Sequence, residues 1–137
     1  MPFVWRSRIR FVDTDASRRI HYTAMMRHFE AAEHEFLMHI GSPYTQITTR
    51  EIGYPRVHVE VDFHSPVTYN DVLDIAVSVG HVGGSSFSFL FDASVEGRRA
   101  ASGKIVVVAM SMATKKSCAV PEDLAAALRP HISERTT

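Results

Sequence analysis

Residues 22–39, YTAMMRHFEAAEHEFLMH, contain neither glycine nor proline and decide how the rest of the chain must fold. Their apolar side chains recur at spacings of three and four, the period of an amphipathic helix, and include Met25, Phe29, Ala32 and Phe36. Gly41 is expected to end the helix. A helix of this length measures about 27 Å at the standard rise, which is long enough to cross a small sheet.

Four strands are predicted after this helix. Alternating apolar and polar residues mark the first at 57–64, and the second follows at 72–82, ahead of a turn at Gly83 and Gly84. A third strand runs through residues 87–95. The fourth, at about 100–112, is apolar on both faces, as is typical of a central strand with covered neighbours. Short turns are expected to join the four in sequence.

The segment before the helix also reads as a strand, at residues 4–12, and the C-terminal region as a short helix at about 121–128. In the strand, Trp5, Ile9 and Phe11 fall on one side and arginines on the other. The whole chain, residues 1–137, is therefore predicted to be one α+β domain, with a long helix on a five-stranded antiparallel sheet. Unpaired outer strands in such a sheet favour pairing with a second copy, as a homodimer.

Composition narrows the range of functions. The formal net charge is zero, which argues against a nucleic-acid partner. No apolar run reaches the roughly 20 residues of a membrane helix, and residues 1–10 lack the apolar core of a secretory signal, so we expect a cytoplasmic protein without a membrane partner. Cys118 is the single cysteine. Two histidines and two acids share one face of the strand predicted at 57–64, namely His58, Glu60, Asp62 and His64. Neighbours on one face of a strand lie nearly 7 Å apart and do not easily converge on one ion, so no metal site is expected.

The loop between the first strand and the helix, residues 11–22 or FVDTDASRRIHY, holds the candidate chemistry. Asp13 and Asp15 lie where the chain enters a helix N-terminus. Unpaired N–H groups at such a terminus can hold a developing oxyanion, while a carboxylate beside them can act as nucleophile or general base. That combination suits attack on a thioester, although two acids in a loop are also common turn residues.

These features, taken in order, resemble the 4-hydroxybenzoyl-CoA thioesterase and short-chain acyl-CoA thioesterase branch of the hotdog superfamily over most of the chain. Proteins of that branch read D-x-D-x-x-G, then an aromatic or histidine pair, a helical acid and an E-F-L-like segment. The matching residues here are Asp13, Asp15, His21, Tyr22, Glu30 and residues 35–37. Later matches fall at residues 53–55, Phe63, Pro66, residues 71–73 and residues 85–87.

The resemblance implies a hotdog fold and a role for each matching residue. Asp15 corresponds to the catalytic carboxylate, which either attacks the thioester or activates water, and the backbone N–H of Tyr22 corresponds to the oxyanion donor. Glu30 either faces the acyl pocket or pairs with His34 one turn along. Further substrate-binding positions, some of them from a partner chain, are His21, Tyr54, Phe63, His64, Ser85 and Ser86.

Two departures from the family pattern bear on the site. Arg18 stands where the family usually has glycine, so a positive φ there would strain the backbone or the loop must take another path. The basic residues that hold coenzyme A phosphates in the hydroxybenzoyl enzyme are replaced by Gly83, Gly84, Ser85 and Ser86. Backbone N–H groups of this segment could bind the coenzyme A phosphates instead. The other candidates for this role are the cations Arg18, Arg19, Lys115 and Lys116.

The prediction is an acyl-CoA thioesterase that forms a homodimer or homotetramer. Coenzyme A is part of the substrate, so no separate cofactor is expected. The alternative is a non-catalytic module that binds acyl-CoA or an acyl carrier on the same fold, because a fold does not fix a function.

Overall fold

The computed structural model describes residues 2–47 and 50–133. Their helices and strands follow one another along the chain, with three-residue 3-10 helices labelled η. The bounds are β1 Phe3–Arg8, η1 Phe11–Asp13, α1 Ala24–His39, α2 Tyr44–Ile47, β2 Ile52–Gly53, β3 Arg56–Phe63, β4 Val72–Val82, β5 Ser86–Val95, β6 Arg98–Val108, β7 Met110–Ser111, α3 Glu122–Leu128 and η3 Arg129–His131.

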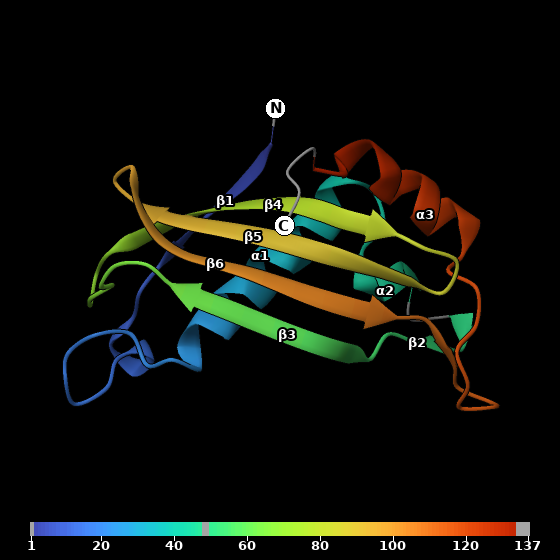
Figure 1. Cartoon of the computed structure of the whole chain (residues 1–137), viewed down its shortest axis with the longest axis horizontal. Helices are drawn as coiled ribbons and strands as arrows, with labels where there is room; N and C mark the ends of the chain where they lie inside the picture. Colours follow the sequence, from blue (N-terminus) through green and yellow to red (C-terminus); the bar gives the residue numbers. More distant parts are fainter. Residues whose placement is uncertain (1, 48–49, 134–137) are drawn as a thin grey trace.

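Five strands form one antiparallel sheet in the order β1-β4-β5-β6-β3, and α1 crosses behind it (Figure 1). The predicted α+β arrangement of a long helix on a five-stranded antiparallel sheet is thus confirmed. Short turns join β4, β5 and β6 as expected. The prediction that they join all four strands is wrong, because β3 pairs with β6 at the edge and residues 64–71 cross to β4.

The core lies between α1 and the sheet. The predicted apolar stripe of the helix is fully buried, and it comprises Met25, Phe29, Ala32 and Phe36. Phe29 stacks on Phe91 of β5, with ring centroids 4.7 Å apart. Gly103 of β6 allows this approach, since a Cβ at that position would lie only 2.5 Å from the Phe29 ring.

Gly41 ends α1 as predicted. It adopts φ 82°, a left-handed conformation that glycine takes without steric cost. The Gly41 N–H donates to the Met38 carbonyl at 3.1 Å, and the Ser42 N–H donates to the Leu37 carbonyl at 2.8 Å. This paired closure is a Schellman motif, which satisfies carbonyls that the end of the helix would otherwise leave unpaired.

The first strand is shorter than predicted and ends at Arg8. The Asp13 carboxylate accepts a hydrogen bond from the Arg10 N–H at 2.8 Å, which coils residues 11–13 into η1 and ends the strand's alternation. Ile9 is buried, but Phe11 is 79% exposed instead of lying on the buried side. The placement of Phe11 with Trp5 and Ile9 is therefore wrong. Among the described residues, no helix combines the length and apolarity needed to span a membrane.

Candidate active site

Asp15 lies on the exposed loop between η1 and α1. Its Oδ1 accepts hydrogen bonds from the Ser17 hydroxyl at 2.5 Å and from the Ser17 N–H at 2.8 Å. The hydroxyl contributes most, and together these bonds hold the pKa of Asp15 below its ordinary value. Asp15 is thus a solvent-accessible carboxylate that is ionised at neutral pH, the state that attack or proton abstraction requires.

Two backbone hydrogen bonds close the loop around Asp15. The Asp15 N–H donates to the Arg19 carbonyl at 3.0 Å, and the Arg18 N–H donates to the Asp15 carbonyl at 2.9 Å. Arg18 adopts φ 67°, so the position where the family usually has glycine does use the left-handed region. The loop path is reached with a non-glycine residue, at a cost of roughly 1–2 kcal/mol.

His21 and Tyr22 lead from this loop into the helix. The His21 N–H donates to the Asp13 carbonyl at 2.7 Å, and the His21 ring stacks on the Tyr22 ring at 4.6 Å. The Tyr22 side chain is 71% exposed. Within the described part of the chain, no hydrogen bond uses the backbone N–H of Tyr22. That N–H is therefore available to a bound oxygen atom, as its predicted role requires.

A cavity of about 300 Å³ opens beside Asp15, and the sequence did not predict it. Its walls are Phe11, Thr14, Asp15, Arg18 and Tyr69. The Phe11 and Tyr69 rings meet edge to face, with centroids 6.0 Å apart. The only sequence signal for this wall was the spacing of Phe11, Asp13 and Asp15. The apolar pattern instead assigned Phe11 to the strand predicted at residues 4–12.

Asp13, the other acid of the pair, is buried at 4% exposure. Burial opposes its ionisation most strongly. The hydrogen bonds from the Arg10 N–H and His28, with the charges of His28 and Arg27, outweigh burial and lower the pKa of Asp13. The two acids therefore differ in their surroundings, because Asp15 faces solvent and Asp13 is enclosed by hydrogen-bond donors.

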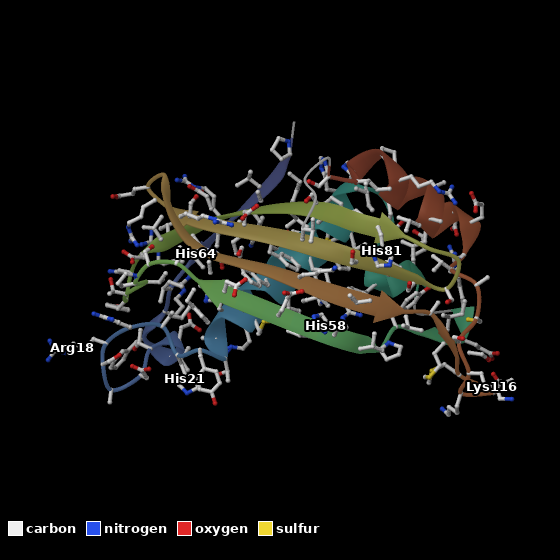
Figure 2. All side chains as sticks on the ribbon, in the orientation of Figure 1. Arg18, His21, His58, His64, His81 and Lys116 are labelled. Atoms are coloured by element: carbon white, nitrogen blue, oxygen red, sulfur yellow. The ribbon has the colours of Figure 1, made fainter. Side chains whose placement is uncertain are left out.

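The structure divides the predicted substrate-binding residues between the two ends of the sheet. Phe63 ends β3 and His64 follows it on the side of the Asp15 loop, where Figure 2 also places His21 and Arg18. Tyr54 follows β2, and Ser85 and Ser86 lie where the β4–β5 turn enters β5; Figure 1 shows β2 and this turn at the other end of the sheet. One protomer alone does not bring these two groups together.

Several predicted residues have partners that bear on their roles. Glu30 is exposed, and no ion pair among the described residues joins it to His34, whose ring packs against Tyr44 at 4.7 Å. Ser86 Oγ lies 3.2 Å from His81 Nε2. The Tyr54 hydroxyl is buried without a hydrogen-bond partner in the described residues. No three of the described His, Cys, Asp and Glu side chains gather as metal ligands.

Replacing Ser17 with Ala should raise the pKa of Asp15, because the hydroxyl that most favours the carboxylate is lost. A carboxylate acts only above its pKa, so the acid limb of the kcat/KM profile should move to higher pH while activity at neutral pH stays nearly unchanged. Initial rates across the acidic range check this. An unmoved acid limb would mean that another group controls it.

The long helix packed on a five-stranded antiparallel sheet is the arrangement of the hotdog fold. A family model described as the thioesterase-like superfamily matches residues 9–128. The chain therefore belongs to the thioesterase-like superfamily.

Relatives and solved structures agree with this assignment. A 1,4-dihydroxy-2-naphthoyl-CoA hydrolase of Prochlorococcus marinus (strain MIT 9303) is 28% identical over 124 residues, covering 85% of this chain and 82% of that protein. The structure of a gentisyl-coenzyme A thioesterase has a TM-score of 0.83 at 27% identity, covering 92% and 99% of the two chains. A thioesterase-superfamily structure from Jannaschia sp. CCS1 has a TM-score of 0.86 at 26% identity, covering 96% and 94%.

Proposed function

We propose that this protein hydrolyses the thioester of an acyl- or aroyl-CoA to a free acid and coenzyme A. The observation that carries the proposal is the pairing of an ionised, accessible Asp15 with an unused Tyr22 N–H at the two ends of one short loop. Coenzyme A enters as part of the substrate, and the proposal needs no separate cofactor.

The proposed chemistry uses Asp15 in one of two ways. As general base, it accepts a proton from water while the water oxygen adds to the carbonyl carbon. As nucleophile, it adds directly, forms an anhydride as the C–S bond breaks, and water then cleaves that anhydride. In both routes negative charge develops on the carbonyl oxygen, where the Tyr22 N–H would stabilise it by about 3 kcal/mol. The thiolate leaves and takes up a proton.

The cavity beside Asp15 is our proposed site for the acyl group. Its Phe11 and Tyr69 rings offer apolar faces and edges, which favour an aromatic group through offset or edge-to-face contacts. Two of the similar proteins carry names that state aromatic CoA esters as their substrates. We therefore infer an aroyl-CoA as the favoured substrate.

A homodimer is proposed to complete the site. β3 is an edge strand and leaves apolar side chains in solvent, with Val57 60%, Val59 48% and Phe63 47% exposed. Antiparallel pairing of two β3 strands would bring the Tyr54 end of one copy to the Asp15 end of the other. Sedimentation velocity at micromolar concentration checks this, and a monomer there would contradict it.

Thiol release from a panel of CoA esters tests the proposed function. Benzoyl- and hydroxybenzoyl-CoA are expected to give a higher kcat/KM than acetyl- or palmitoyl-CoA, because only the aromatic esters fill the cavity with a ring. Calorimetry with the same esters covers the alternative of a binding module, which would appear as binding without turnover. Neither binding nor turnover with any ester would reject both readings.

A further inference from the structure

The Asp13 side chain joins the loop to α1. Its Oδ1 accepts a hydrogen bond from Arg27 Nη2 at 2.7 Å, and its Oδ2 lies 3.0 Å from His28 Nε2. Oδ2 also accepts the Arg10 N–H at 2.8 Å. Because the carboxylate is an acceptor only, the nearby His28 Nε2 must carry a proton. Asp13 therefore binds two neighbouring residues of α1 and the start of η1.

The Asp13 backbone reaches the opposite end of the same loop. Its carbonyl accepts the His21 N–H at 2.7 Å. Asp13 precedes Asp15 by two residues, and His21 directly precedes Tyr22. One buried residue thus holds both the segment that presents the carboxylate and the segment that presents the oxyanion donor.

His28 extends this arrangement to the sheet. Its Nδ1 lies 2.6 Å from Ser7 Oγ, and Ser7 pairs with Leu73 in the β1–β4 ladder. His28 is itself buried. The chain Ser7–His28–Asp13 therefore connects the loop to a strand, β1, and to a helix, α1. We refer to these three residues as the loop anchor.

We propose that the loop anchor positions the reacting groups, with Asp13 and His28 acting as positioning residues for the hydrolysis of the thioester. The inference rests on the proposed function. It assigns a role to two residues that contact neither the substrate nor the attacking water in the proposed reaction. A displacement of about 1 Å in a reacting group can cost 10²-fold in rate, so small shifts of residues 14–22 matter. The anchor holds Asp15 and the Tyr22 N–H at a fixed separation.

The His28 side chain offers the cleanest test. His28→Leu removes the ring nitrogens but leaves Asp13 bonded to Arg27 and the Arg10 N–H, so the buried carboxylate keeps donors and the fold should persist. His28→Gln keeps an N–H that can reach Asp13. We expect His28→Leu to lower kcat by about 10- to 100-fold with KM nearly unchanged, and His28→Gln to recover most of the loss.

Tyr44→Phe provides the matched control. This substitution removes the Tyr44 hydroxyl, which donates to the carboxylate of Glu33. That contact also belongs to α1 and is partly buried, but it lies away from the loop. A merely structural loss of that kind should lower thermal stability without changing kcat at temperatures where the protein is folded. Hydrogen exchange at the amides of residues 14–22 gives a readout independent of activity, and it should accelerate in His28→Leu but not in Tyr44→Phe.

The outcomes separate this inference from the proposed function. Folded His28→Leu with the kcat of the native protein and unchanged exchange would overturn the loop anchor, as would a rise in KM alone. If the native protein hydrolyses no thioester, the proposed function fails, and exchange at residues 14–22 still decides whether the anchor fixes the loop.

Discussion

Replacing Asp15 with Asn is expected to lower kcat/KM for thioester hydrolysis by about 10²–10⁴-fold, the usual contribution of a general base. That range corresponds to about 3–5 kcal/mol of transition-state stabilisation. The amide has nearly the shape of the carboxylate, and its oxygen can still accept the Ser17 N–H, so the loop should keep its path. What is lost is the negative charge that is proposed to attack the carbonyl or to take a proton.

Thiol release measured with the best ester of the panel checks this, together with calorimetric binding of the same ester. Binding should persist in Asp15→Asn, because the cavity walls other than Asp15 are untouched. Asp74→Asn is the matched control, since Asp74 is a partly exposed acid of β4, is paired with Arg6 at 2.9 Å and is not among the described residues that line the cavity beside Asp15. Equal rates for the native protein and Asp15→Asn would remove Asp15 from the mechanism.

The elements of this fold could be predicted wherever burial is local and periodic. β4 matches the prediction at both ends, because its alternating residues face the helix on one side only. The place of β3 could not be predicted in this way. The alternation of apolar and polar residues at 57–63 indicates which face of the strand is covered, but not which strand lies beside it. The partner, β6, lies far away in the sequence.

The residues proposed for the site could be named from the sequence, but the contacts that support them could not. The acidic loop and the helix start mark the segment, and the family resemblance assigns roles in it to Asp15 and Tyr22, which stay predictions. The loop anchor was missed because its helical member His28, like the neighbouring Arg27, lies outside the predicted apolar stripe of α1 and resembles an ordinary polar residue of a helix surface. The turn at η1 buries Asp13 beneath Arg27 and His28 and gives both residues a shared partner.

The second large effect is expected at Glu33, a carboxylate in the interior that serves the fold instead of the chemistry. It is 1% exposed, and it accepts hydrogen bonds from the Tyr44 hydroxyl and from Arg56 Nη2. Arg56 also donates to the Tyr54 carbonyl at 2.7 Å. Burial contributes most to raising the pKa of Tyr44, and the charge of Glu33 adds to it, so the phenol stays protonated and remains a donor. Glu33 therefore links α1, α2 and the start of β3.

Glu33→Ala should lower the free energy of unfolding by about 3 kcal/mol, because it removes the buried carboxylate that pairs with the Arg56 cation and accepts a hydrogen bond from the Tyr44 hydroxyl. That is a large part of the roughly 5–15 kcal/mol that stabilises a typical domain. Glu33→Gln should cost less, about 1–1.5 kcal/mol, since the amide oxygen still accepts but carries no charge. Urea unfolding followed by circular dichroism measures both.

Glu30→Ala supplies the comparison for this series on the same helix. Glu30 is exposed, so its removal should change the free energy of unfolding by less than about 0.5 kcal/mol. If Glu33→Ala unfolds at the same urea concentration as Glu30→Ala, the buried carboxylate contributes no net stability, and the desolvation of Glu33 and Arg56 cancels their attraction. If the predicted order holds, the contacts of Glu33 with Tyr44 and Arg56 stabilise the junction of α1 with α2 and the edge strand β3.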